Sequence, residues 1–139
     1  MLKNKRAKSL VVIMLIIAVS AFILRFAVIK AIRLNISYDE TIASATLKLI
    51  SAALENYSKD NKGLFPSAIS ELVITEPAYL DRDYTKQFPI KGYNYVCDRL
   101  DSLGYNCSAV PIRCNITGQK IFKVSTGSLF VTQDCRKEE

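Results

Sequence analysis

Histidine and tryptophan are absent from the 139 residues, and glycine and proline are scarce, with five and four copies. No glycine or proline occurs before Gly63, so the first 62 residues lack the two residue types that most often interrupt helices. Acidic residues are missing before Asp39. Without histidine, and with no serine or cysteine beside a plausible base and no glycine loop for phosphate, we expect no enzyme and no catalytic residues.

The cysteines number four and lie in the last third of the chain, at Cys97, Cys107, Cys114 and Cys135. Their spacing lacks the CxxC pattern of zinc sites, and an even number fits two disulfides in an oxidising compartment. Three pairings are possible, and we favour Cys97–Cys107 with Cys114–Cys135 because the first two stand at the stems of one expected hairpin. We expect no metal and no cofactor; Asp98 and Asp101 carry oxygen ligands suited to calcium, but we interpret them as part of a solvated loop.

An apolar run begins at Ser9 and continues to Leu24 without a charge. Sixteen helical residues cover about 24 Å, and counting through Ile29, with Arg25 snorkelling to the headgroups, lengthens the span enough for a hydrocarbon core of about 30 Å. A secretory signal peptide is the alternative, but the run is long and no A-x-A-like cleavage step follows it. We therefore expect a retained transmembrane helix at residues 9–30.

Positive charge is concentrated near this run. Residues 1–35 contain seven basic and no acidic residues, whereas residues 36–139 contain twelve basic and thirteen acidic ones. Cations beside a membrane span favour the cytoplasmic side, so residues 1–8 are expected to form a basic cytoplasmic leader and the C-terminal part to lie outside. The near-neutral remainder gives no reason to expect nucleic acid as a partner.

The helical pattern continues past the membrane run, so one helix over roughly residues 9–59 is expected, with residues 31–62 amphipathic. Asn61 or Gly63 suits a left-handed C-terminal cap. The expected apolar face consists of Ile32, Ile36, Ile42, Ala45, Leu49, Ala53, Leu54 and Tyr57.

Beyond Gly63 the pattern changes to short elements that form a head at residues 63–139. Ser67 is placed to cap a short helix over residues 68–73. The expected strands are residues 93–97 and 105–110, on either side of a loop at 98–104, then 120–124, with a short fourth at 128–131. The expected fold class is α+β, a long N-terminal helix packed on a small C-terminal antiparallel sheet.

These features together resemble a type IV pilin or a type II secretion pseudopilin. The similarity is most specific in Arg33-Leu34-Asn35 and in the helix text from Thr41 to Tyr57. Asp60–Pro66 with Ser70–Val73, and Gly92–Tyr95 at the start of the first strand, are also similar to the family. The resemblance implies a filament subunit in the bacterial inner membrane, with other pilin or pseudopilin subunits, a prepilin peptidase and assembly machinery as partners.

The same resemblance implies a processing site and a packing surface. A prepilin peptidase would cut between Ala7 and Lys8, which places Val12 where the family has a glutamate at the fifth mature position. Helix packing is expected through Leu10, Ile13, Ile17 and Leu24. The alternative is a single-span, membrane-anchored extracytoplasmic binding domain of pilin shape that does not polymerise.

Overall fold

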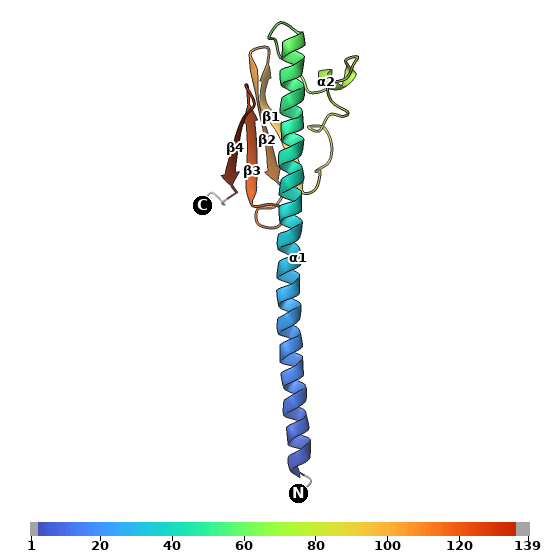
Figure 1. Cartoon of the computed structure of the whole chain (residues 1–139), viewed down its shortest axis with the longest axis vertical. Coiled ribbons are helices and arrows are strands. Elements are labelled where there is room, and N and C mark those ends of the chain that lie inside the picture. The colour runs from blue at the N-terminus through green and yellow to red at the C-terminus, as the bar shows by residue number, and fades with distance from the viewer. Residues whose placement is uncertain (1–2, 136–139) are drawn as a thin grey trace. The chain divides into compact units, whose positions relative to one another are not determined.

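Figure 1 shows the computed structural model, which describes residues 3–135, with side chains from Ser9 onward. Within these residues the helices are α1 (Lys3–Asp60) and α2 (Glu71–Ile74), and the strands are β1 (Tyr93–Asp101), β2 (Gly104–Pro111), β3 (Lys120–Ser125) and β4 (Leu129–Asp134). The strands form one antiparallel sheet in the order β1-β2-β3-β4. The expected α+β fold, a long N-terminal helix on a small antiparallel sheet, is confirmed.

The chain divides into two units, Met1–Leu34 and Asn35–Glu139. The described part of the first unit consists of α1 residues alone. The second, called the head unit below, contains the remainder of α1, then α2 and the sheet. α1 begins at Lys3, earlier than the expected residue 9, because nothing in the basic leader interrupts a helix.

The end of α1 follows the expected cap. Lys62 and Gly63 have positive φ angles of 59° and 85°, and the Gly63 N–H donates to the Ser58 carbonyl at 2.7 Å. This bond satisfies a carbonyl of the last helical turn, as in a Schellman ending. Asn61, the other candidate, instead donates its side-chain amide to the Tyr57 carbonyl at 2.9 Å.

The first hairpin is longer than expected, since most of the expected loop at 98–104 is strand. β1 and β2 leave only Ser102 and Leu103 as the turn. A register shift between Cys97 and Arg99 absorbs one residue as a bulge, which lets pairing continue beyond it. The Asp101 carboxylate then accepts the N–H groups of Leu103 and Gly104 at 2.9 and 3.1 Å, which closes the turn.

Two further elements differ from expectation. α2 begins at Glu71, not residue 68, because the Ser67 hydroxyl bonds the Glu71 carboxylate instead of capping a helix. The Glu71 N–H bonds the Ala68 carbonyl three residues back, so the preceding residues form a tighter turn. β4 extends to Asp134, beyond the expected 128–131.

The buried face of α1 was only partly anticipated. Ala45 and Leu49 are exposed, whereas Ala43, Leu47 and Ile50 are buried. The apolar pattern does not separate the two faces, because Ala45 and Leu49 repeat at the same interval of four residues as Ala43 and Leu47. The buried stripe also contains Ser51, whose hydroxyl shares a hydrogen bond of 2.8 Å with the Tyr105 hydroxyl of the sheet.

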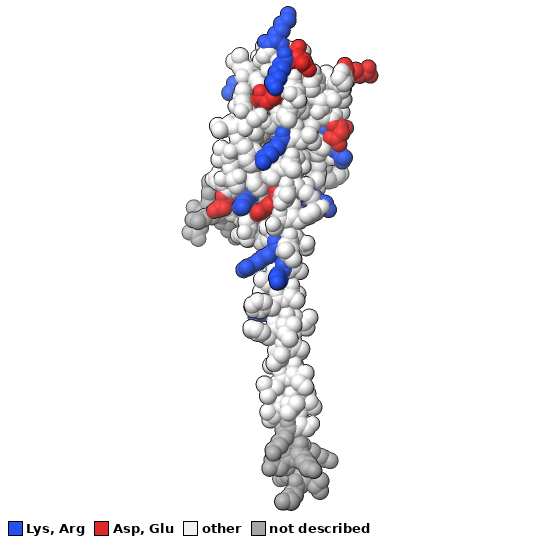
Figure 2. All heavy atoms as spheres, in the orientation of Figure 1, with Lys and Arg blue, Asp and Glu red and all other residues white. Residues whose placement is uncertain are grey.

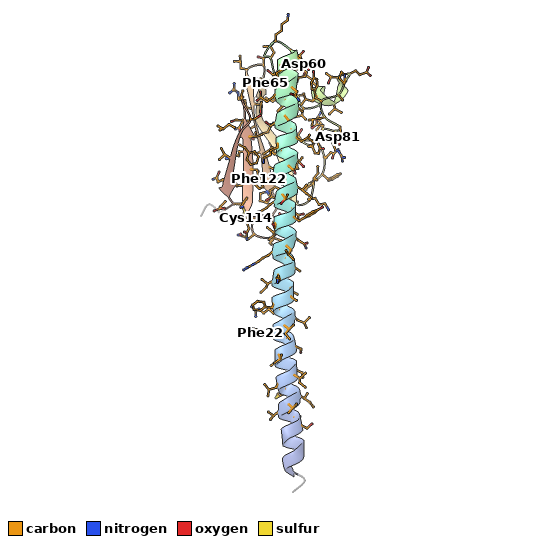
Figure 3. All side chains as sticks on the ribbon, in the orientation of Figure 1. Phe22, Asp60, Phe65, Asp81, Cys114 and Phe122 are labelled. Carbon is orange, nitrogen blue, oxygen red and sulfur yellow. A yellow bond between two sulfur atoms is a disulfide. The ribbon has the colours of Figure 1, made fainter. Side chains whose placement is uncertain are left out.

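The core of the head unit lies between this stripe and one face of the sheet. The sheet side contributes large side chains that are almost fully buried, and the loops after α1 close the edge. The core of the head unit includes Leu47, Ile50, Leu54, Leu72, Tyr93, Tyr105, Ala109, Phe122 and Val124. Figure 3 labels Phe122 between sheet and helix.

Two glutamates of α1 hold the two ends of β3, and we call them the carboxylate clamp. Glu40 accepts the Gln119 N–H at 2.8 Å, just before β3. Glu55 accepts the Gly127 N–H at 2.7 Å, just after β3, and the Tyr105 hydroxyl at 2.9 Å. Fifteen helical residues cover about 22 Å, close to the length of a strand and its flanking residues. The clamp therefore fixes the register of α1 on the sheet.

Candidate functional site

The candidate functional surface is the apolar segment, residues 9–29 of α1. All of its residues are exposed, and its large apolar side chains keep between 45% and 73% of their surface open. Figure 2 shows Lys, Arg, Asp and Glu gathered on the head, whereas the apolar segment is almost uncharged. Among the described residues one helix is long and apolar enough to cross a membrane. In water so large an apolar surface would be unfavourable, so lipid or protein must cover it.

One hydroxyl of this segment is satisfied within the helix itself. The Ser20 hydroxyl donates to the Ile17 carbonyl at 2.9 Å, which satisfies the hydroxyl within its own helix. Phe22 and Phe26 lie one turn apart with ring centroids at 5.7 Å. Phe22 projects outward from the helix in Figure 3. The segment can therefore lie in lipid with its helical backbone and the Ser20 hydroxyl already hydrogen-bonded.

The four expected packing residues lie on one stripe of the apolar segment. Leu10, Ile13, Ile17 and Leu24 are 64%, 49%, 60% and 65% exposed, so each is free to contact another molecule. Their spacing of three, four and seven residues places them on one helix face. The structure thus brings these candidates together.

A second face carries a shallow groove of about 370 Å³, which sequence reasoning missed. It is lined by Val12, Leu15, Ile16, Val19, Ser20 and Ile23. At about 100° per residue, this face lies about 120° around the helix from the Leu10 stripe. A segment that is apolar on every side gives no periodic signal, so the sequence alone could not single out this face.

The proposed processing residues are Ala7 and Lys8. Their backbone belongs to α1, but their side chains lie outside the described residues.

The cysteines are joined as Cys97–Cys107 and Cys114–Cys135, the pairing favoured from the hairpin. Cys97 and Cys107 are direct partners across β1 and β2, with Cα atoms 3.9 Å apart. The second disulfide ties Cys135, just beyond β4, to the connection between β2 and β3. Both bonds therefore brace the sheet of the head unit.

Of the two acids considered for calcium, Asp101 is engaged by groups of the protein itself. Arg99 donates to the Asp101 carboxylate at 2.7 Å, and this guanidinium, together with the Leu103 N–H, lowers the Asp101 pKa. Asp98 is exposed on the bulge. Across the described residues no group of three or more cysteine or acidic side chains is arranged to hold a metal ion.

A hollow of about 450 Å³ opens between the outer edge of β1 and the loops before it. Asp83 lines it and accepts the Thr85 N–H and hydroxyl through one carboxylate oxygen, at 3.0 and 2.6 Å. Its other oxygen is buried without a hydrogen bond among the described residues, although the Lys86 ammonium lies 3.7 Å away. Ser67 and Asp98 also line the hollow, so it is polar enough to receive a small ligand or a peptide side chain.

Comparisons with protein-family models, with curated proteins and with solved structures find no match to this chain.

Proposed function

We propose that the chain is a structural subunit of a filament like the type IV pilus or the type II secretion pseudopilus, assembling through its apolar segment. The observation that carries this proposal is the unbroken α1, which is exposed and apolar over residues 9–29 and buried against a sheet farther on. A plain anchor is commonly joined to its domain by a flexible linker. Here the anchor and the domain share one helix.

The apolar segment is suited to two successive environments. In the bilayer, lipid covers it; in a filament, the same side chains pack against helices of neighbouring subunits. The Leu10 stripe and the groove face point in different directions, so contact between them is heterologous. Such contacts generate an open helical assembly when the rotation between copies does not close. Two faces on one helix therefore favour a filament over a closed dimer.

Charge and disulfides support one orientation. The basic leader favours a cytoplasmic N-terminus in the inner membrane, and two disulfides suit an oxidising compartment for the head. The expected partners are other pilin or pseudopilin subunits, the inner membrane, a prepilin peptidase and its assembly machinery.

Val12, the fifth residue after a cut at Ala7, would affect how the helices of neighbouring subunits pack. Val12 has no charge to pair with a neighbour's terminal amine, and it lines the groove. Packing at this position would therefore be apolar, without the cost of burying an ion pair.

The alternative function is a single-span anchored domain that binds a ligand outside the cytoplasm and does not polymerise. The polar hollow beside β1, where one Asp83 oxygen is buried without a hydrogen bond among the described residues, supports this alternative.

The N-terminal mass of the protein recovered from membranes separates the two functions. The filament proposal predicts a mature chain that begins at Lys8, because a prepilin peptidase would remove residues 1–7. An intact Met1 favours the anchored domain. A terminus beyond Ile29 contradicts both functions, since cleavage would have removed the apolar segment.

A further inference from the structure

One end of the head unit carries exposed apolar and basic side chains that come from separate parts of the sequence. Tyr38 lies in α1, Phe88 and Lys91 precede β1, and the connection between β2 and β3 supplies the others. We call this set the base patch: Tyr38, Phe88, Lys91, Ile112, Arg113 and Ile116. Phe88 is 93% exposed and Ile116 is 60% exposed.

Contacts within the head unit show that these segments are neighbours. The Lys91 ammonium lies 5.8 Å from the Tyr38 ring centroid. The Ile112 N–H donates to the Gly92 carbonyl at 2.9 Å, which joins the two connections directly. Phe88 is three residues before Lys91, and the backbone between them limits how far apart they lie. In Figure 1 both connections lie at the end of the sheet opposite the β1–β2 turn.

The connection that presents Ile116 is held rigidly. The Thr117 and Ile116 N–H groups both donate to the Arg113 carbonyl, at 3.0 and 3.1 Å. Cys114, labelled at this end of the sheet in Figure 3, is bonded to Cys135. Ile116 is therefore fixed in its exposed position and cannot fold back into the core without opening this turn.

The charge of the patch is positive. No acidic residue occurs between Asp101 and Asp134, so Arg113 is the one charge in the 112–119 connection. The acids near this end of the head unit are Asp39 and Glu40 on α1 and Asp134 at the end of β4, opposite Lys120, and Glu40 accepts the Gln119 N–H at 2.8 Å. Aromatic, aliphatic and basic side chains in one small surface are typical of protein that lies at a bilayer interface.

The sequence joins the base patch to the apolar segment by a short stretch of chain. Tyr38 is nine residues after Ile29, so at most about 30 Å of chain separates the two residues. A stable protein interface needs about 20 to 30 residues on each side, many more than this patch offers.

We infer that the base patch rests on the membrane, with Phe88 and Ile116 in the headgroup region and Lys91 and Arg113 against anionic phosphates. This inference rests on the membrane anchoring in the proposed function. It adds that the head lies on the bilayer before assembly, held by a second and weaker contact than the helix. Each basic residue near an anionic surface contributes about 1 kcal/mol.

The absence of tryptophan makes a direct test possible, because each introduced tryptophan is the single indole of the protein. Full-length Phe88→Trp and Ile116→Trp proteins are placed in nanodiscs that contain phosphatidylglycerol and a lipid with a nitroxide on its headgroup. Leu103→Trp, in the β1–β2 turn and 77% exposed at the native leucine, is the matched control. Phe22→Trp, measured with acyl-brominated lipid, reports the anchor itself.

We expect the headgroup nitroxide to quench the indoles at positions 88 and 116 at least about twofold more than the indole at position 103, and phosphatidylcholine alone to reduce the difference. Equal quenching at positions 88, 116 and 103, with position 22 quenched by brominated lipid, overturns the base patch and leaves the anchor intact. Blue-shifted but unquenched emission at 88 and 116 overturns it too, since protein would then cover the patch. An unquenched position 22 shows that the membrane anchoring itself is wrong.

Discussion

Replacing Glu55 tests how α1 is held on the sheet. One oxygen of its carboxylate accepts both the Gly127 N–H at 2.7 Å and the Tyr105 hydroxyl at 2.9 Å. Hydrogen bonds to a charged group contribute about 1.5 to 3 kcal/mol each. In Glu55→Ala the Tyr105 hydroxyl still has Ser51 at 2.8 Å, and water can reach Gly127. The net loss should therefore be about 2 kcal/mol rather than the sum of both bonds.

The assay is thermal unfolding of the full-length protein in detergent, followed by the near-ultraviolet circular dichroism of the buried tyrosines. A domain of this size loses about 4 to 8 °C in Tm per kcal/mol, so Glu55→Ala should melt about 8 to 16 °C lower. Glu55→Gln keeps an acceptor oxygen but loses the charge, which roughly halves the strength of each bond and lowers the Tm by about 4 to 8 °C.

Glu76→Gln, at an exposed position, is the control and should change the free energy of unfolding by less than about 0.5 kcal/mol. A Glu55→Ala protein that melts within about 2 °C of the native protein refutes the clamp. A double-mutant cycle also refutes the clamp if the losses in unfolding free energy of Glu55→Ala and Tyr105→Phe add within about 0.3 kcal/mol, since residues in contact should couple.

Three further changes follow from the head unit. Leu47→Ala removes a fully buried side chain and should lower the free energy of unfolding in urea by about 2 to 5 kcal/mol. Leu49→Ala, at a position 47% exposed, should lower it by less than about 1 kcal/mol. Equal losses would contradict the assignment of Leu47 to the buried face of α1. Cys107→Ser opens the bond to Cys97 and should lower head stability by about 3 kcal/mol, measured by thermal melting, without changing membrane insertion; an unchanged Tm would contradict the role of this disulfide. Burial raises the pKa of Tyr95, so the neutral side chain contributes to the free energy of unfolding below about pH 10, and this contribution is lost as the pH rises further. Tyr95→Phe should therefore reduce the fall in Tm between about pH 8 and 11. An identical fall in the variant and the native protein would contradict this effect of burial.

The architecture could be predicted from the sequence because its signals are local. A segment without glycine or proline up to residue 62, and the cap at Gly63, define α1 almost completely. The hairpin stems place Cys97 opposite Cys107, so proximity alone favours the right pairing.

Tertiary contacts determine the features that the sequence pattern did not predict. The bulge after Cys97 extends β1 to Asp101, and no residue preference signals a bulge at that position. Ser51 is buried because Tyr105 supplies a hydrogen bond across fifty-four residues, which an apolar pattern cannot register. For the same reason the clamp at Glu40 and Glu55 was missed: both look like ordinary solvent-facing acids on a helix.

Photocrosslinking in membranes tests most directly whether the apolar segment is an assembly surface. A photoreactive phenylalanine at Ile17 or at Val19 samples the two faces of the segment, and the same group at Leu103 serves as the control. A filament subunit should give covalent dimers and a ladder of higher oligomers from Ile17 and Val19, in cells that contain the assembly machinery, and none from Leu103. Adducts to lipid alone, with the protein monomeric at both helix positions, would contradict the filament subunit and leave the anchored binding domain as the function.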